Sequence, residues 1–108
     1  MKLHVTINGT AYPCELDSLG AARLYEKTFR KPYTAIDYRY VTDITDQLWA
    51  GVADMYAAQH GKDFGMDADT FARSLTAEDL AALVGAIQSV KVDAEGKEAK
   101  KKKPTRPA

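Results

Sequence analysis

Few side chains in this sequence are of the types that support catalysis or metal binding. Cysteine and histidine occur only as Cys14, His4 and His60. A nucleophilic cysteine needs exposure and a neighbouring base, whereas Cys14 falls on the apolar side of the ribbon predicted below and is interpreted as a small core residue. A single cysteine also excludes an intrachain disulfide and a cysteine-based zinc cage. His60, with Asp63 nearby in sequence, is interpreted as a residue at a helix end.

Three carboxylates lie close together in sequence, at Asp63, Asp67 and Asp69. A calcium loop of the EF-hand type needs acidic groups at alternate positions, a central glycine and a terminal bidentate glutamate. Here the glycine falls at residue 65 and no glutamate has the required spacing, so the pattern does not fit. The seven glycines are scattered and form no phosphate-binding GxGxxG or GxxxxGK[ST] motif. We therefore expect no enzymatic activity, no cofactor and no metal site.

Aromatic side chains are the remaining candidates for a binding site. Trp49 lies among the apolar positions of a predicted helix and is interpreted mainly as a core residue, with a partner groove or a base-stacking platform as the alternative. Tyr33, Tyr38 and Tyr40 fall in a connection, residues 32–41, that cannot bury three rings without help. Internal packing and a place in an interface are equally open as roles for these tyrosines. Together with Trp49, they are the candidate partner-binding residues.

The elements that would position these residues begin with a β-hairpin. Apolar and polar residues alternate from residue 2 to residue 7, which is the period of a half-buried strand. Asn8-Gly9 is a preferred pair for a two-residue type I′ turn. Because two strands alone are only marginally stable, the ribbon must pack on another element. The turn predicts these cross-strand pairs: Ile7 with Thr10, Val5 with Tyr12, and Leu3 with Cys14.

Helix signals follow along the chain. Ser18 is the predicted N-cap of a helix that runs to about residue 30 and ends before a proline. A central helix is expected to begin between Thr42 and Thr45 and to end at His60, where Gly61 suits a left-handed C-cap. The last two helices have their own caps, which are Asp67 for a short helix and Thr76 with Asp79 in a capping box. The sequence therefore predicts one α+β domain over residues 1–90, with an N-terminal β-hairpin packed on three to four helices.

The charge balance separates this domain from a basic tail. Residues 1–90 carry 8 basic and 12 acidic groups, whereas residues 91–108 carry 7 and 3. The tail has too few apolar residues to offset its ordering entropy, so we expect it to be disordered. A solvated tail is the ordinary interpretation of its lysine run, and a weak, salt-dependent contact with phosphate is the alternative. The run consists of Lys100, Lys101, Lys102 and Lys103.

Hydropathy and charge also bear on location and partners. No apolar run approaches the ~20 residues that span a bilayer, and the first residues alternate instead of forming the apolar stretch of a signal peptide. We therefore expect a cytoplasmic protein that has no membrane partner. The acidic body of the domain argues against nucleic acid as a partner.

Three segments together resemble a known family. The opening KLHVTINGTAYPCELDSLGAARLYEKTFRK combines a short ribbon and an NG turn with a helix of aliphatic, aromatic, Glu and Lys positions. The segments DITDQLWAGVADMYAAQHG and TAEDLAALVGAI follow as a central and a closing helix. In pattern and element order, about residues 1–90 resemble the tail assembly chaperones of long-tailed (siphovirus-type) bacteriophages and prophages.

The resemblance implies a non-enzymatic role in virion assembly in the cytoplasm of a bacterial host. Chaperones of this family bind the tape-measure protein, keep it soluble and help to recruit tail-tube subunits around it. The family also commonly makes a longer form by ribosomal frameshifting near the end of the short reading frame. The lysine run must be written in AAA or AAG codons, which can form a slippery sequence, and an ordinary solubilising tail is the alternative.

Two other functions stay open from the sequence. One is a small nucleic-acid-associated regulatory protein that uses its basic tail, and the other is an accessory protein-interaction subunit of an enzyme. The edge strand beside Pro13 and the connection over residues 33–40 are candidates for self-association into a homo-oligomer.

Overall fold

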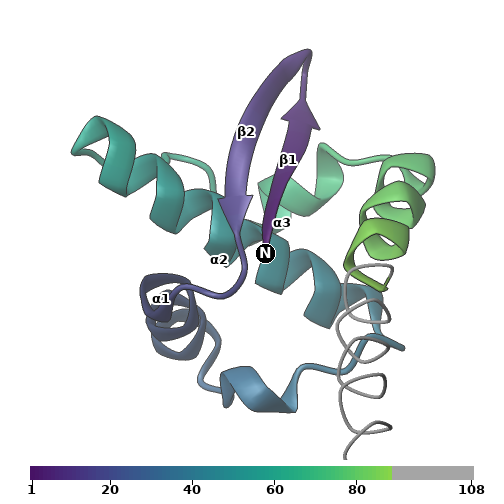
Figure 1. The fold of residues 1–108 in the computed structure, drawn as a ribbon, viewed down its shortest axis with the longest axis horizontal. Helices are drawn as coiled ribbons and strands as arrows, with labels where there is room; N and C mark the ends of the chain where they lie inside the picture. The colour runs from purple at the N-terminus through teal and green to yellow at the C-terminus, as the bar shows by residue number, and fades with distance from the viewer. Residues whose placement is uncertain (89–108) are drawn as a thin grey trace, which may run out of the picture.

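The computed structural model describes residues 1–88, so the tail and the lysine run at Lys100–Lys103 lie outside the described residues. The described part has an N-terminal β-hairpin packed on helices, which is the α+β fold that the sequence predicts. Figure 1 shows the hairpin lying across a long central helix, with the other helices arranged around that helix.

The elements follow one another in the predicted order. The last helix begins at residue 77 and continues to residue 88, where the described part ends. A short 3-10 turn, η1, precedes the central helix. The bounds are β1 Lys2–Ile7, β2 Thr10–Glu15, α1 Leu19–Phe29, η1 Tyr33–Ala35, α2 Val41–His60 and α3 Ala68–Arg73.

The hairpin has the predicted turn and the predicted register. Asn8 and Gly9 have φ angles of 50° and 83°, the positive values that a type I′ turn requires. Strand pairing is antiparallel, and all three predicted pairs are present. Because side chains alternate across a strand, this register places Val5, Ile7 and Cys14 together on the buried face of the ribbon.

Local capping bonds begin three of the helices where the sequence predicts them. The Ser18 hydroxyl accepts the backbone N–H of Ala21 at 2.9 Å, at the start of α1. Asp67 accepts the N–H of Thr70 at 2.7 Å, at the start of α3. The last helix has the predicted capping box, because Thr76 and Asp79 each accept the other's backbone N–H.

The start of the central helix differs from the prediction. α2 begins at Val41 instead of between residues 42 and 45, and its N-cap Tyr40 makes no side-chain capping bond. The Thr45 hydroxyl is unavailable as a cap because it donates to the carbonyl oxygens of Val41 and Thr42, at 3.1 and 3.2 Å. A threonine inside a helix commonly bonds back to the preceding turn. The helix ends as predicted at His60, with Gly61 in the left-handed conformation.

The core lies between the hairpin and one face of α2. Leu48 and Val52 of α2 are fully buried, as are Val5 of the hairpin and Phe71 of α3. β2 crosses α2 at Gly51, where an added Cβ would lie 2.6 Å from the sulfur of Cys14 and 3.1 Å from the carbonyl oxygen of Glu15. The absence of a side chain at residue 51 therefore lets the strand approach the helix closely.

Cys14 occupies the core position that the sequence predicts. Its side chain is 1% exposed, and its thiol donates to the carbonyl oxygen of Leu48 at 3.6 Å. Burial raises the pKa of the Cys14 thiol to about 12. A thiol that stays protonated and enclosed is a poor nucleophile.

Cys14 is therefore expected to resist a thiol reagent such as DTNB in the folded protein. The reaction at pH 8 should be slower than that of the unfolded chain by about a thousandfold or more, since reaction requires opening that costs about 5 kcal/mol. Stopped-flow absorbance with and without denaturant measures both rates. Equal rates in the two conditions would contradict the burial of this thiol.

Candidate functional site

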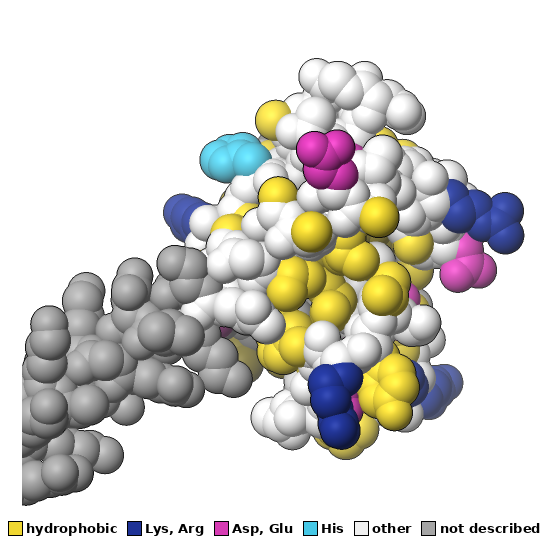
Figure 2. Space-filling model, turned by 90° about the vertical axis from the view of Figure 1, so that its right-hand side faces the viewer, with side chains coloured by type: hydrophobic (Ala, Val, Ile, Leu, Met, Phe, Trp, Pro, Cys, Tyr) yellow, Lys and Arg dark blue, Asp and Glu magenta, His cyan; other side chains and the backbone are white. Residues whose placement is uncertain are grey.

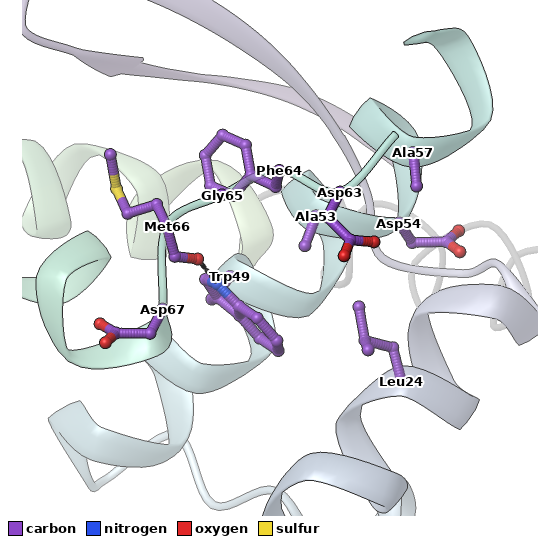
Figure 3. Close-up of a pocket in the computed structure, with 10 residues that line it drawn as sticks. All are labelled: Leu24, Trp49, Ala53, Asp54, Ala57, Asp63, Phe64, Gly65, Met66 and Asp67. Atoms are coloured by element: carbon purple, nitrogen blue, oxygen red, sulfur yellow. Dashed lines mark hydrogen bonds between the residues drawn. The ribbon is translucent and has the colours of Figure 1, made fainter. Parts of the chain in front are cut away.

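A pocket of about 630 Å³ opens between α1, α2 and the connection that joins α2 to α3. This volume falls within the range of about 300–1,000 Å³ that is typical of ligand sites. Figure 3 shows side chains from all three segments arranged around it. Its lining residues are Leu24, Trp49, Ala53, Asp54, Ala57, Asp63, Phe64, Gly65, Met66 and Asp67.

Trp49 forms one wall of the pocket. Its indole N–H donates to the carbonyl oxygen of Met66 at 2.7 Å, the bond drawn as a dashed line in Figure 3. The ring also meets Phe29 of α1 edge to face, with the centroids 5.7 Å apart. Trp49 is only half-buried, so it packs against the core and lines the pocket as well. The sequence favours a core role for Trp49 and keeps a partner groove as the alternative, and its position combines core packing with a place in the pocket wall.

Asp54 fixes the end of the pocket where α1 begins. Its carboxylate accepts the Ser18 hydroxyl at 3.0 Å, so Ser18 joins α2 to the first turn of α1. A Cβ added at Gly20 would lie 2.5 Å from the nearer Asp54 oxygen. Glycine at residue 20 therefore makes room for the carboxylate, whose negative charge is favourable at a helix N-terminus.

The other two carboxylates of the pocket come from the connection. Asp67 caps α3, and the hydrogen bond from the N–H of Thr70 lowers the pKa of its carboxyl group. Asp63 is exposed and lies five residues before α3 begins at Ala68. Within residues 1–88, no ion pair involves Asp54, Asp63 or Asp67. The described residues therefore leave the negative charge of this pocket without a paired cation.

Asp46 adds negative charge to the same side of the central helix. Its side chain is 9% exposed, and burial is the main cause that raises the pKa of its carboxyl group. The charges of Asp43 and Asp69 raise that pKa further, whereas Lys31 lowers it. A raised pKa in the folded state means that the charged carboxylate destabilises the fold.

Replacing Asp46 with asparagine is expected to stabilise the protein at pH 7, because the neutral amide does not carry the cost of desolvating a charged carboxylate. The destabilisation by the charged Asp46 carboxylate is complete at pH values above its pKa in the folded protein. It disappears as the pH falls toward the pKa of aspartate in the unfolded chain, about 3.9. Chemical denaturation of both proteins at pH 7, 5.5 and 4 measures the difference. A difference that stays constant over this range would contradict the assignment to ionisation.

The three candidate tyrosines do not line the pocket with Trp49. The Tyr33 hydroxyl donates to the carbonyl oxygen of Leu16 at 2.6 Å and accepts the Gln47 side-chain amide at 3.3 Å, so this residue has an internal structural role. Tyr38 is partly buried against the core. Tyr40 is 61% exposed at the start of α2.

Two exposed apolar side chains lie at the beginning of α2. Tyr40 and the adjacent Val41 are 61% and 60% exposed. Figure 2 shows hydrophobic side chains gathered in the middle of one face of the molecule, with charged side chains around them. Neither residue lines the pocket that Trp49 lines.

The remaining residues singled out by the sequence have separate environments. His60 lies against the ring of Tyr56, with the centroids 4.3 Å apart. Asp63 and Asp67 line the pocket, whereas Asp69 does not. In the part of the chain that the structure describes, no three His, Cys, Asp or Glu side chains form a group suited to a metal ion. No helix in that part combines the length and apolar character needed to cross a membrane.

Sequence reasoning missed the pocket as a whole. Leu24, Phe64 and Met66 lie far from Trp49 in the chain, and the tertiary fold brings them together. One usable signal was Gly20 inside the first turn of a helix, where glycine is otherwise unfavourable. A glycine at such a position indicates a close approach by another group, here Asp54.

Comparison of the chain with protein-family models, with curated proteins and with solved structures finds no match. The resemblance to tail assembly chaperones therefore stays a prediction from the sequence pattern.

Proposed function

We propose that this protein is a tail assembly chaperone of a long-tailed bacteriophage or prophage, which binds the tape-measure protein and helps to recruit tail-tube subunits without catalysing a reaction. The order of elements supports the proposal. An N-terminal hairpin with an Asn8-Gly9 turn leads into a helix, a long central helix and a closing helix, which is the order on which the resemblance rests.

The observation that carries the proposal is the open, largely apolar pocket between α1, α2 and the connection 61–67. A tape-measure protein is a long helix that exposes apolar stripes until the tail tube encloses it. A small domain can cover part of such a stripe by accepting its side chains in a groove. Several copies along one helix would bind with a higher overall affinity than a single copy, because the arrangement is multivalent.

Co-expression with a fragment of the tape-measure protein from the same genome tests this function. The fragment alone is expected to aggregate, because its apolar stripes are uncovered. With the full-length chain present, the fragment should become soluble and co-purify with several copies of the chain, as measured by light scattering coupled to gel filtration. A fragment that stays insoluble, or a soluble fragment without bound chain, would contradict the proposal.

The nucleotide sequence that encodes residues 97–108 gives a second test. A run of adenines that opens into a long minus-one frame, upstream of a long reading frame for a helical protein, is the result expected for this family. With a mixed AAA and AAG run and no open second frame, the lysine run would give no support to the proposed function.

A further inference from the structure

The apolar part of the pocket is formed by one stripe of the central helix and by two opposing walls. Trp49, Ala53 and Ala57 are spaced four residues apart on α2, so they share one face of that helix. Two of these are alanines, which leave space above the helix. Leu24 of α1 faces this stripe from one side, and the connection that carries Phe64 and Met66 lines the other side, with the Met66 carbonyl directed at Trp49 (Figure 3).

Hydrogen bonds hold these walls in place from both sides. The bond between Ser18 and Asp54 joins α1 to α2, and the bond between Trp49 and Met66 joins α2 to the connection. Phe64 is fixed further by ring contacts with Tyr12 and Tyr56, with centroids 5.3 and 5.4 Å away. The pocket is therefore preformed, which lowers the entropic cost of binding.

Charge complementarity indicates what kind of group the pocket accepts. All ionisable side chains that line it are carboxylates, namely Asp54, Asp63 and Asp67. Within residues 1–88, none of them is in an ion pair. The indole of Trp49 lies between these acids and is a favourable surface for a cation. An occupant therefore gains by presenting a positive charge next to an apolar side chain.

We propose that the pocket binds a helical segment of a protein partner in which lysine or arginine flanks large apolar side chains. The apolar side chains contact Trp49 and its stripe, and the cations contact the three carboxylates at the edge. A helix can present both groups to the pocket because residues three and four apart lie on one face. This inference deepens the proposed function and rests on it for the identity of the partner as a tape-measure protein.

The fluorescence of Trp49 provides a direct readout, since it is the only tryptophan in the chain. The probe is a synthetic amphipathic helix that lacks tryptophan and carries a leucine stripe flanked by lysines. The matched probe has glutamate at each lysine position. Titration into the full-length protein should change the Trp49 emission, and the glutamate probe should bind at least about tenfold more weakly because like charges then face one another.

Two pairs of variants locate the binding surface. Ala57→Arg places a long cationic side chain in the pocket, whereas Ala58→Arg makes the same change at an exposed residue of α2 outside it. Asp63→Lys reverses one pocket charge, and Glu78→Lys reverses an exposed charge on the last helix. The two pocket variants should weaken binding by about tenfold or more, and their controls by less than about twofold. Unchanged melting temperatures would show that all four proteins are folded.

Several results would overturn the inference. Equal affinity for the lysine and glutamate probes, or normal binding by Ala57→Arg, would exclude the pocket as the site. A change in Trp49 emission on dilution of the protein alone would indicate that a second copy of the chain occupies the pocket. That result would also exclude the proposed partner helix as the occupant.

The same variants separate this inference from the proposed function. If Ala57→Arg still solubilises the tape-measure fragment as the parent protein does, the chaperone function stands and the pocket is the wrong site. If the lysine probe binds in the pocket but no tape-measure fragment does, the pocket is a binding site for a cationic helix and the tape-measure protein is not its partner.

Discussion

Gly51→Ala is expected to lower the free energy of unfolding by about 1–3 kcal/mol, the usual cost of overpacking a filled core. The new methyl group would lie 2.6 Å from the Cys14 sulfur and 3.1 Å from both the Glu15 carbonyl oxygen and a methyl carbon of Leu16. The carbonyl belongs to the backbone of β2, so it cannot move without shifting the strand. Strand and helix must separate, and their shared core contacts weaken.

Gly85→Ala is the matched control for this substitution. Gly85 lies in the last helix, and nothing lies within 4 Å of the position of its added Cβ. Without a steric cost, alanine should stabilise the protein by about 0.5–1 kcal/mol through helix propensity. Denaturant unfolding monitored by circular dichroism compares the two variants. Stabilisation by both would show that β2 does not press on α2 at residue 51.

Short-range signals account for the parts of the fold that the sequence predicted. The Asn8-Gly9 turn fixes the register of the hairpin because both residues accept positive φ angles. The hydroxyl of Ser18 and the reciprocal bonds of Thr76 and Asp79 start their helices within three residues of the chain. In each case the partner atoms lie in the same few residues, so no knowledge of the tertiary structure is needed.

The missed features depend on residues far apart in sequence. Gly51 is an ordinary residue of a helical pattern until β2 is placed against it. Asp54 is likewise an ordinary polar position on α2 until it meets Ser18, 36 residues away. The start of α2 was misplaced because Thr45 has a competing acceptor in the preceding turn. The pocket combines several such contacts, and of its lining residues the sequence pattern singled out only Trp49, Asp63 and Asp67.

Phe71→Ala is expected to have the largest effect on stability, a loss of about 3–5 kcal/mol. Phe71 is fully buried and is the only buried residue of α3. A six-residue helix is too short to be stable by itself, so its position depends on this ring. Since Asp67 caps α3 and also lines the pocket, release of α3 should displace that wall and shift the Trp49 emission.

Phe29→Ala removes an identical side chain from a half-buried site at the end of α1 and serves as the control. It should cost less than Phe71→Ala, because part of the Phe29 ring already contacts water. Circular dichroism compares the equilibrium unfolding of the two variants. Trp49 fluorescence is followed in Phe71→Ala alone, because the Phe29 ring contacts Trp49, and it distinguishes local release of α3 from global destabilisation. In Phe71→Ala, a fluorescence transition that precedes the loss of helical signal would show that the pocket wall opens first. Equal losses in the two variants would mean that α3 is not anchored through Phe71.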